Sequence, residues 1–323
     1  MNKTLIGLIC IILGTLLDSI LPIIFQESNI QIYSYLFLMS IVFIILSLIH
    51  IFIFKKNLNE TLSIISKKST DLKIIFYGAI RYLKYLLFTF GALSVQTGIY
   101  NALITTQLIF LTYSTSKENH EKIIAPQISS FFILSVGIGI IIYNSLVNEK
   151  NKISKNFIYG VIALIIALML DIKDDTGFTS ITDNPYEEIF LSSIVMFIIS
   201  LLIVGFRKFY LKKKFGIYGI NNLLYLIAVP ILIVEYIPTL LEFTSYDYLP
   251  SIITMTFFGI QALIGFGLDK YYYKDVFTST KYIGIIILII GIVYAIYAYY
   301  LQNKKITDVN PNQPKVHRFF FYK

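Results

Sequence analysis

The chain has 323 residues, of which 56% are apolar and 14% are charged, and its formal net charge is +8. Soluble domains carry about 25% charged residues, whereas apolar runs of about 18 or more residues indicate membrane-spanning helices. The high apolar and low charged content excludes a soluble enzyme and a disordered chain. A disulfide scaffold is excluded because Cys10 is the single cysteine. The positive charges lie beside apolar runs, as in membrane proteins, so we expect no nucleic acid partner.

Ten apolar segments have about the 20-residue length that a membrane-spanning helix needs. The first follows Lys3 but lacks a small-residue cleavage site, so we expect a retained helix rather than a signal peptide. The fold class is therefore all-α, a polytopic membrane protein, and the polar tail 302–323 is predicted to be disordered. The ten predicted spans cover residues 4–25, 32–54, 76–95, 97–115, 127–147, 157–172, 187–206, 217–237, 249–268 and 281–301.

Two of these spans resemble each other at positions about half the membrane region apart. Residues 127–147 and 281–301 each carry glycines, an isoleucine-rich run and a tyrosine. We therefore predict two five-helix repeats, residues 1–150 and 151–301. Because five is odd, the repeats are expected to be inverted relative to each other, which is a common plan in transporters. The glycines also predict close packing between helices.

The loop charges give two conflicting orientations. Loop 55–73 carries several lysines and its neighbouring short connections carry none, which predicts a cytosolic amino terminus. Ten spans then place the acidic loop 171–188 in the cytosol and the basic segment 207–214 outside, which reverses the usual bias. One resolution is that 157–172 does not cross, leaving nine spans. The other is that the first helices dominate, and we keep ten.

Two cations lie inside the third predicted span. Arg81 and Lys84 are three residues apart and therefore share a helical face. Charges at membrane depth are expensive and usually face a cavity. An arginine can also hold a phosphate or carboxylate through two parallel hydrogen bonds. We predict that both residues bind an anionic solute; the alternative is that both side chains snorkel to the cytosolic surface.

A polar stripe follows the fourth predicted span. Asn101 and Thr105 are four residues apart on one face, with Tyr100 and Gln107 beside it. Such a face either lines a water-filled path or bonds a neighbouring helix. Gln261 is the matching amide of the second half. We predict that Tyr100, Asn101, Gln107 and Gln261 form hydrogen-bonding walls of a substrate site.

Residues 86–116, LLFTFGALSVQTGIYNALITTQLIFLTYSTS, resemble the drug/metabolite transporter superfamily. The second half ends similarly, with a short loop that contains Asp269 and Lys270 and then a glycine-containing helix. The closest likeness is to nucleotide-sugar transporters, and the matching residues are Ala92, Leu93, Tyr100, Gln107 and Leu108. The resemblance implies a ten-helix, two-repeat carrier whose central cavity is lined by helices 1, 3, 4, 6, 8 and 9.

The sequence also departs from the nucleotide-sugar transporter pattern. Ile109 stands where these transporters place a lysine, and Arg207-Lys208 is the nearest analogue of their Glu-Lys pair. We therefore transfer the fold and the carrier function from the resemblance, but not the nucleotide-sugar substrate. We expect a multi-pass integral membrane protein; which membrane it occupies is left open, with an endomembrane slightly favoured.

Three functional hypotheses follow. The first is a secondary transporter of a small organic, anionic or phosphorylated solute that works by alternating access. The second is a prenyl transferase in which Asp171, Asp174 and Asp175 hold Mg²⁺ against a diphosphate. The third is a non-transporting membrane scaffold. We favour the transporter, with the solute and the lipid bilayer as partners, a homodimer left open, and neither enzymatic activity nor a cofactor or metal expected.

Overall fold

The computed structural model describes residues 3–28, 31–55, 68–107, 125–148, 155–179, 181–182, 184–213, 220–249 and 251–309. All regular secondary structure in these residues is helical, which confirms the predicted all-α class. A shorter apolar stretch covers Phe157–Asp171. Six described segments are long and apolar enough to cross a membrane: Lys3–Glu27, Ile32–Ile53, Ala125–Val147, Tyr186–Phe209, Asn221–Glu242 and Ser279–Ala298.

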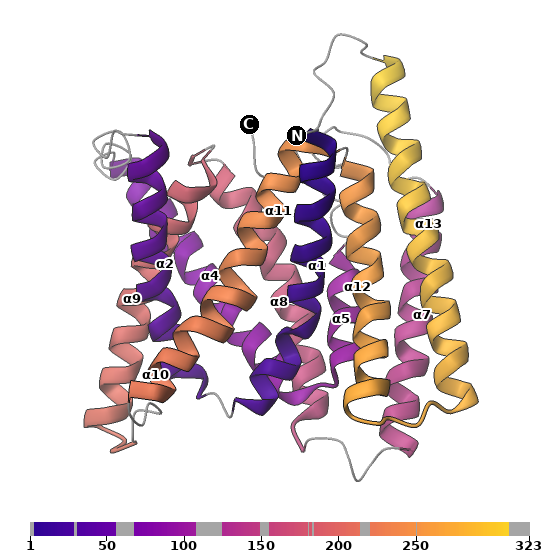
Figure 1. The fold of residues 1–323 in the computed structure, drawn as a ribbon, viewed down its shortest axis with the longest axis horizontal. Helices are drawn as coiled ribbons and strands as arrows, with labels where there is room; N and C mark the ends of the chain where they lie inside the picture. The colour runs from indigo at the N-terminus through magenta and orange to yellow at the C-terminus, as the bar shows by residue number, and fades with distance from the viewer. Residues whose placement is uncertain are drawn as a thin grey trace. The chain divides into compact units, whose positions relative to one another are not determined.

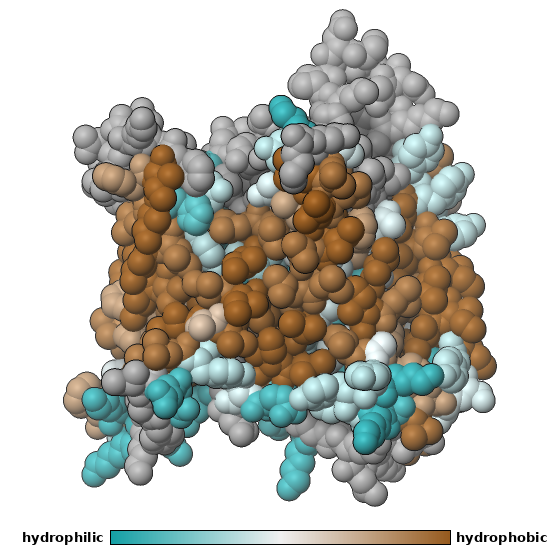
Figure 2. Space-filling model, in the orientation of Figure 1, coloured by the Kyte–Doolittle hydropathy of each residue, from teal (hydrophilic) through white to brown (hydrophobic). Residues whose placement is uncertain are grey.

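The described helices are drawn in Figure 1. Apolar side chains cover their middle parts on the visible face, and hydrophilic side chains gather near helix ends (Figure 2). This apolar surface suits a lipid environment, where every backbone polar group of a helix is bonded internally. The helices are α1 (Lys3–Glu27), α2 (Ile32–Lys55), α4 (Lys68–Ser94), α5 (Thr97–Thr105), α7 (Ala125–Asn148), α8 (Phe157–Thr179), α9 (Pro185–Phe209), α10 (Ile220–Leu226), the π-helix η1 (Ile227–Tyr236), α11 (Ile237–Tyr248), α12 (Ser251–Tyr272) and α13 (Ser279–Val309).

Several helices extend beyond the predicted spans, and α11 continues the span predicted to end at 237 as far as Tyr248. α4 begins at Lys68, and α8 continues to Thr179, so that the predicted loop 171–188 begins as helix. Asp171 and Asp174 of α8 bond to Lys84 of α4. α13 continues to Val309, inside the segment 302–323 that the sequence predicts to be disordered. Gln302, Lys304 and Lys305 in this stretch favour a helix. The predicted span 97–115 is described only as far as Gln107.

The chain forms two compact units that interleave along the sequence. The described part of unit 1 lies in Met1–Ile23, Gly91–Ile165 and Pro238–His317, and the described part of unit 2 lies in Ile24–Phe90 and Ile166–Ile237. Each unit contains residues from both predicted repeats. The units therefore do not correspond to the two predicted repeats. The repeat boundary between residues 150 and 151 stays a prediction.

In unit 1, α7 and α13 run side by side with their backbones in close contact (Figure 1). A Cβ atom built on Gly137 would lie 2.8 Å from the backbone nitrogen of Leu288. One built on Gly291 would lie 2.9 Å from the backbone nitrogen of Leu134. Gly139, which is also on α7, faces open space. Glycine therefore sets the distance between these helices on one face only, in the manner that the sequence predicts.

In unit 2, α2 packs against α9. Val195 of α9 also fills the space above Gly78 of α4, where an added Cβ atom would lie 2.6 Å from the Val195 Cβ. The close approach of α4 to α9 positions the polar residues that follow Gly78 on α4. The apolar cluster that holds this part of unit 2 together consists of Ile51, Ile74, Phe190, Leu191 and Val195.

The helical run from α10 to α11 contains the ten-residue π-helix η1. Pro230 lies inside η1 and has no backbone N–H to donate. A proline inside a helix breaks the α-type hydrogen-bond ladder, and π turns are one arrangement that accommodates the break. Glu235 of η1 accepts a hydrogen bond of 3.2 Å from the Tyr35 hydroxyl of α2.

Candidate functional site

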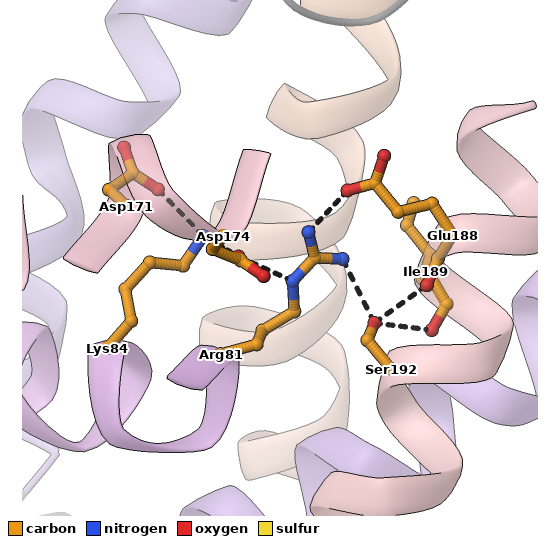
Figure 3. A network of polar contacts seen from close by, with 7 residues as sticks. All are labelled: Arg81, Lys84, Asp171, Asp174, Glu188, Ile189 and Ser192. Atoms are coloured by element: carbon orange, nitrogen blue, oxygen red, sulfur yellow. Dashed lines mark hydrogen bonds and ion pairs between the residues drawn. The ribbon is translucent and has the colours of Figure 1, made fainter. Parts of the chain in front are cut away.

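A buried cluster of charged side chains lies in unit 2 (Figure 3). It is built from three helices that are otherwise mostly apolar. Residues one helical turn apart project from the same face, so each helix can supply two polar groups to one point. The contributing pairs are Arg81 and Lys84 from α4, Asp171 and Asp174 from α8, and Glu188 and Ser192 from α9.

The Arg81 guanidinium is bonded on three sides. Its Nε donates to Asp174 Oδ2 at 2.7 Å, and its Nη1 donates to Ser192 Oγ at 2.9 Å. Its Nη2 forms an ion pair with Glu188 Oε1. The Ser192 hydroxyl in turn donates to the Glu188 carbonyl one turn earlier in α9, at 2.8 Å. The planar fork of an arginine suits this arrangement, because its N–H groups point in fixed directions.

Lys84 connects to the same cluster through Asp174. Its Nζ donates to Asp171 Oδ1 and to Asp174 Oδ2, both at 2.7 Å. Asp174 Oδ2 therefore accepts from both cations, and Asp174 is fully buried. Its other oxygen, Oδ1, is buried and has no hydrogen-bond partner among the described atoms. This oxygen can accept a hydrogen bond from a water molecule, a proton donor or a solute hydroxyl.

Neither cation reaches the surface. Arg81 is 6% exposed and Lys84 is 7% exposed, so the alternative that both side chains snorkel is wrong for the described structure. The cluster contains two cations, Arg81 and Lys84, and the three carboxylates of Asp171, Asp174 and Glu188. Burying such charges costs several kcal/mol for each ion unless they are paired and hydrogen-bonded. The cations are thus held by internal counter-charges in this state of the protein.

The polar stripe of the fourth predicted span lies in unit 1. Asn101 is fully buried in α5, and its Nδ2 donates to the Ser19 carbonyl of α1 at 3.0 Å. A Cβ atom built on Gly265 of α12 would lie 2.5 Å from this same nitrogen. The Thr105 hydroxyl donates to the Asn101 carbonyl. For Asn101 the geometry therefore favours bonding to a neighbouring helix over lining a water-filled path.

The other predicted wall residues also lie in unit 1. Tyr100 of α5 and Gln261 of α12 are buried, and Gln107 is half-buried. Asn101 Oδ1 and Thr97 Oγ1, one turn apart on α5, are buried without a hydrogen-bond partner among the described atoms. The structure thus brings Arg81 and Lys84 together in unit 2 and keeps the amide and tyrosine residues in unit 1. Their role as walls of a substrate site stays a prediction.

Asp269 of α12 caps the beginning of α5. Its two carboxylate oxygens accept hydrogen bonds from the backbone N–H groups of Thr97 and Gly98, at 3.1 and 2.7 Å. The first N–H groups of a helix have no partner inside the helix, and a carboxylate also suits the positive end of the helix dipole. A Cβ atom on Gly98 would lie 2.3 Å from Phe266, so only glycine admits this contact. The sequence predicts a loop at Asp269, and nothing in its local pattern indicates this role.

A second pair of acidic groups joins α1 to α11 in unit 1. The side chains of Asp18 of α1 and Glu242 of α11 lie close to each other. Gly14 lies one turn before Asp18, and an added Cβ atom there would lie 3.6 Å from Glu242 Cγ. The small residue thus leaves room for the glutamate side chain.

The hypothetical Mg²⁺ site is described in part. Asp171 and Asp174 bond to Lys84 and Arg81, and the Asp175 side chain lies outside the described atoms. Where side chains are described, no group of three or more His, Cys, Asp or Glu residues is placed to share a metal ion. Two of the three aspartates therefore serve as counter-ions here.

The sequence prediction includes neither Glu188 nor Ser192, and it gives the α8 aspartates a different role, in binding Mg²⁺. The spacing of the charged residues in the sequence indicates this cluster. The two cations of α4 and the two aspartates Asp171 and Asp174 are both three residues apart, and a buried cation needs a nearby counter-charge. Matching the two pairs would have predicted the cluster. The chain matches no protein-family model and no curated protein.

Proposed function

We propose that the protein is a secondary transporter of a small organic solute, and that the buried cluster around Arg81 and Lys84 is part of its binding site. The observation that carries the proposal is the burial of four charged groups, those of Arg81, Lys84, Asp174 and Glu188, among mostly apolar helices. Charges at membrane depth are energetically costly, and where they occur they usually mark solute or ion pathways.

The proposed architecture is ten membrane-spanning helices in two inverted repeats. Three helix contacts support it. α2 packs against α9, α5 against α12, and α7 against α13. In the predicted series of ten spans these are the second and seventh, the fourth and ninth, and the fifth and tenth. In each of these three pairs a helix packs against the helix five places later in the series, as expected where a pseudo-two-fold axis relates two five-helix repeats.

The proposed solute carries a carboxylate or phosphate group. In the described structure Glu188 and Asp174 occupy the guanidinium of Arg81, so an anionic solute must exchange with one of them. Glu188 is the better candidate, since Asp174 also holds Lys84. A carboxylate that leaves its cation inside a buried site is costly unless it takes up a proton or reaches water. Solute binding at Arg81 is therefore coupled to proton uptake by Glu188 or to its exposure.

The test is a thermal-stability screen of the purified protein with nucleotide sugars, sugar phosphates, organic acids, amines, and prenyl diphosphates with Mg²⁺. A ligand at about a hundredfold excess over its dissociation constant stabilises by about 2.7 kcal/mol. We expect one anionic class to stabilise the protein, with the effect lost in Arg81→Gln. Glu188→Gln removes the internal competitor and should raise the affinity for that anion about tenfold.

Glu187→Gln is the matched control. Glu187 is also buried at the start of α9, but its carboxylate accepts a hydrogen bond from Thr182 of the same segment. We expect its anion affinity to equal that of the wild type. Stabilisation by an anion that survives in Arg81→Gln would contradict the site, as would equal effects of the two glutamate variants. Stabilisation only by prenyl diphosphate with Mg²⁺ would contradict the transporter and favour the enzyme.

A further inference from the structure

A hollow at one end of unit 2 is lined by basic residues and is separate from the buried cluster. Its lining includes Gln31, Tyr33 and Ser34 at the beginning of α2, and Arg207, Lys208 and Lys213 at the end of α9. None of the lining residues is acidic. In the part of the chain that is described, the ion pairs include none of these three cations. Three neighbouring cations repel one another unless an anion lies between them.

The local structure holds the cations in this position. Arg207 lies over the Tyr33 ring, with its guanidinium carbon 4.2 Å from the ring centroid. After α9 the chain turns back at Lys212, whose φ is 50°. The Lys213 N–H then donates to the Arg207 carbonyl at 2.9 Å. A left-handed residue after a helix allows this return, which brings Lys213 beside Arg207. The charges therefore converge instead of spreading along an extended chain.

The hollow also lies where a membrane surface is expected. One candidate span begins at Ile32 and another ends at Phe209, so the hollow lies at the end of both. Leu202, Phe206 and Tyr210 follow one face of α9 toward it, at 68%, 55% and 75% exposed. Aromatic residues are enriched at membrane surfaces, and basic pockets there bind lipid head groups.

We propose that this hollow binds a phosphate group, with Arg207, Lys208 and Lys213 as its cationic ligands and the Ser34 hydroxyl and Gln31 amide as further donors. The exposed face of α9 favours a phospholipid head group as the source, because acyl chains can lie along Leu202 and Phe206. A phosphorylated solute or free phosphate offers the same chemistry. The site also gives the basic segment 207–214 a local role that does not depend on membrane orientation.

The experiment measures the thermal stability of the full-length protein in detergent with three additions. They are phosphatidic acid, phosphatidylcholine and inorganic phosphate, the last at an ionic strength matched with chloride. We expect phosphatidic acid to stabilise more than phosphatidylcholine. In the double variant Arg207→Gln/Lys213→Gln its apparent affinity should fall at least about tenfold. Stabilisation by inorganic phosphate alone, lost in the same variant, supports the phosphate site and identifies a soluble source.

The end of α12 provides a matched control. It has the same turn, in which Lys274 has a φ of 51° and the Asp275 N–H lies 3.3 Å from the Asp269 carbonyl. The double variant Lys270→Gln/Lys274→Gln removes the same charge, but two aspartates lie in this turn. We expect it to bind phosphatidic acid as the wild type does. Equal loss in both double variants would overturn the proposal, as would unchanged binding in Arg207→Gln/Lys213→Gln. Conservative Arg207→Lys should bind with intermediate affinity, because it retains the charge without the fork.

Discussion

Asp269 shows how a single carboxyl group links the folding of unit 1 to pH. Burial raises the pKa of Asp269 to about 7, although the hydrogen bonds from Gly98 and Thr97 act in the opposite direction. In the unfolded chain the same group titrates near 3.8. Between these values the folded protein binds the extra proton, so the contribution of Asp269 to stability is largest at low pH. It is lost as the pH rises through about 7.

We therefore predict that Asp269→Asn changes the pH dependence of unfolding. Asparagine does not titrate, so the wild-type unfolding temperature should fall relative to that of the variant as the pH rises from about 4 to about 7. Thermal unfolding in detergent at several pH values measures the difference. The control is Asp275→Asn, which changes a neighbouring carboxylate that pairs with Lys281. A constant difference between wild type and Asp269→Asn across this range would contradict the prediction.

The buried ion pair of Arg81 with Glu188 leads to a prediction about stability. Removing one partner of a buried ion pair leaves the other charge uncompensated and typically costs about 3–5 kcal/mol. Arg81→Gln should therefore unfold at a lower temperature than wild type. The double variant Arg81→Gln/Glu188→Gln removes one charge of each sign and should recover part of the loss. A double-mutant cycle of unfolding free energies measures the coupling, and simple additivity of the two losses would contradict a direct pair.

The sequence predicts the location of the charged residues better than their partners. Arg81 and Lys84 stand out because they interrupt an apolar segment, and burial confirms that this position is unusual. Their counter-ions could not be chosen from local spacing alone, because Asp174 and Glu188 are about 90 to 107 residues away in the chain. Such pairing depends on which helices are neighbours, and helical periodicity contains no information about that.

At the scale of helices, the contact between α7 and α13 provides an internal comparison. Gly137 faces the backbone of α13, whereas Gly139 faces open space. Gly137→Ala should weaken the packing of the two helices and lower the unfolding temperature, because a Cβ atom so close to backbone cannot be relieved by a rotamer change. Gly139→Ala should be neutral or slightly stabilising, since alanine favours the helix. Equal effects of the two substitutions would contradict the assigned packing face.

The positions of apolar helices could be predicted from the sequence, and their ends less well. Hydropathy locates the segments because lipid-facing surface must be apolar all along its length. It stops at the first charged residues, which is why the prediction ends α8 near Asp171. In the structure the helix continues, since Asp171 and Asp174 are neutralised by α4 and not by water. A run of charges at the end of a helix, as in α8, therefore shortens the predicted span even where another helix pairs with those charges.

For the whole molecule, the proposed architecture predicts ten membrane crossings. Lys155 precedes α8, and Lys213 follows α9. If both helices cross, these two positions lie on the same side of the membrane, and if the predicted span 157–172 does not cross, they lie on opposite sides. We expect the same side. Single cysteines at each position in a Cys10→Ser background, labelled with an impermeant maleimide, test this, and opposite labelling would contradict ten spans.

The π-helix η1 affects how the chain tolerates length changes. A π turn closes over one residue more than an α turn, so η1 holds surplus residues within its span. Deleting one residue there can convert a π turn into an α turn while the flanking helices keep their registers. The same deletion in α13 would rotate every later residue and turn Gly291 away from α7. Length variants among descendants of this gene should therefore accumulate in η1 and be absent from the glycine face of α13.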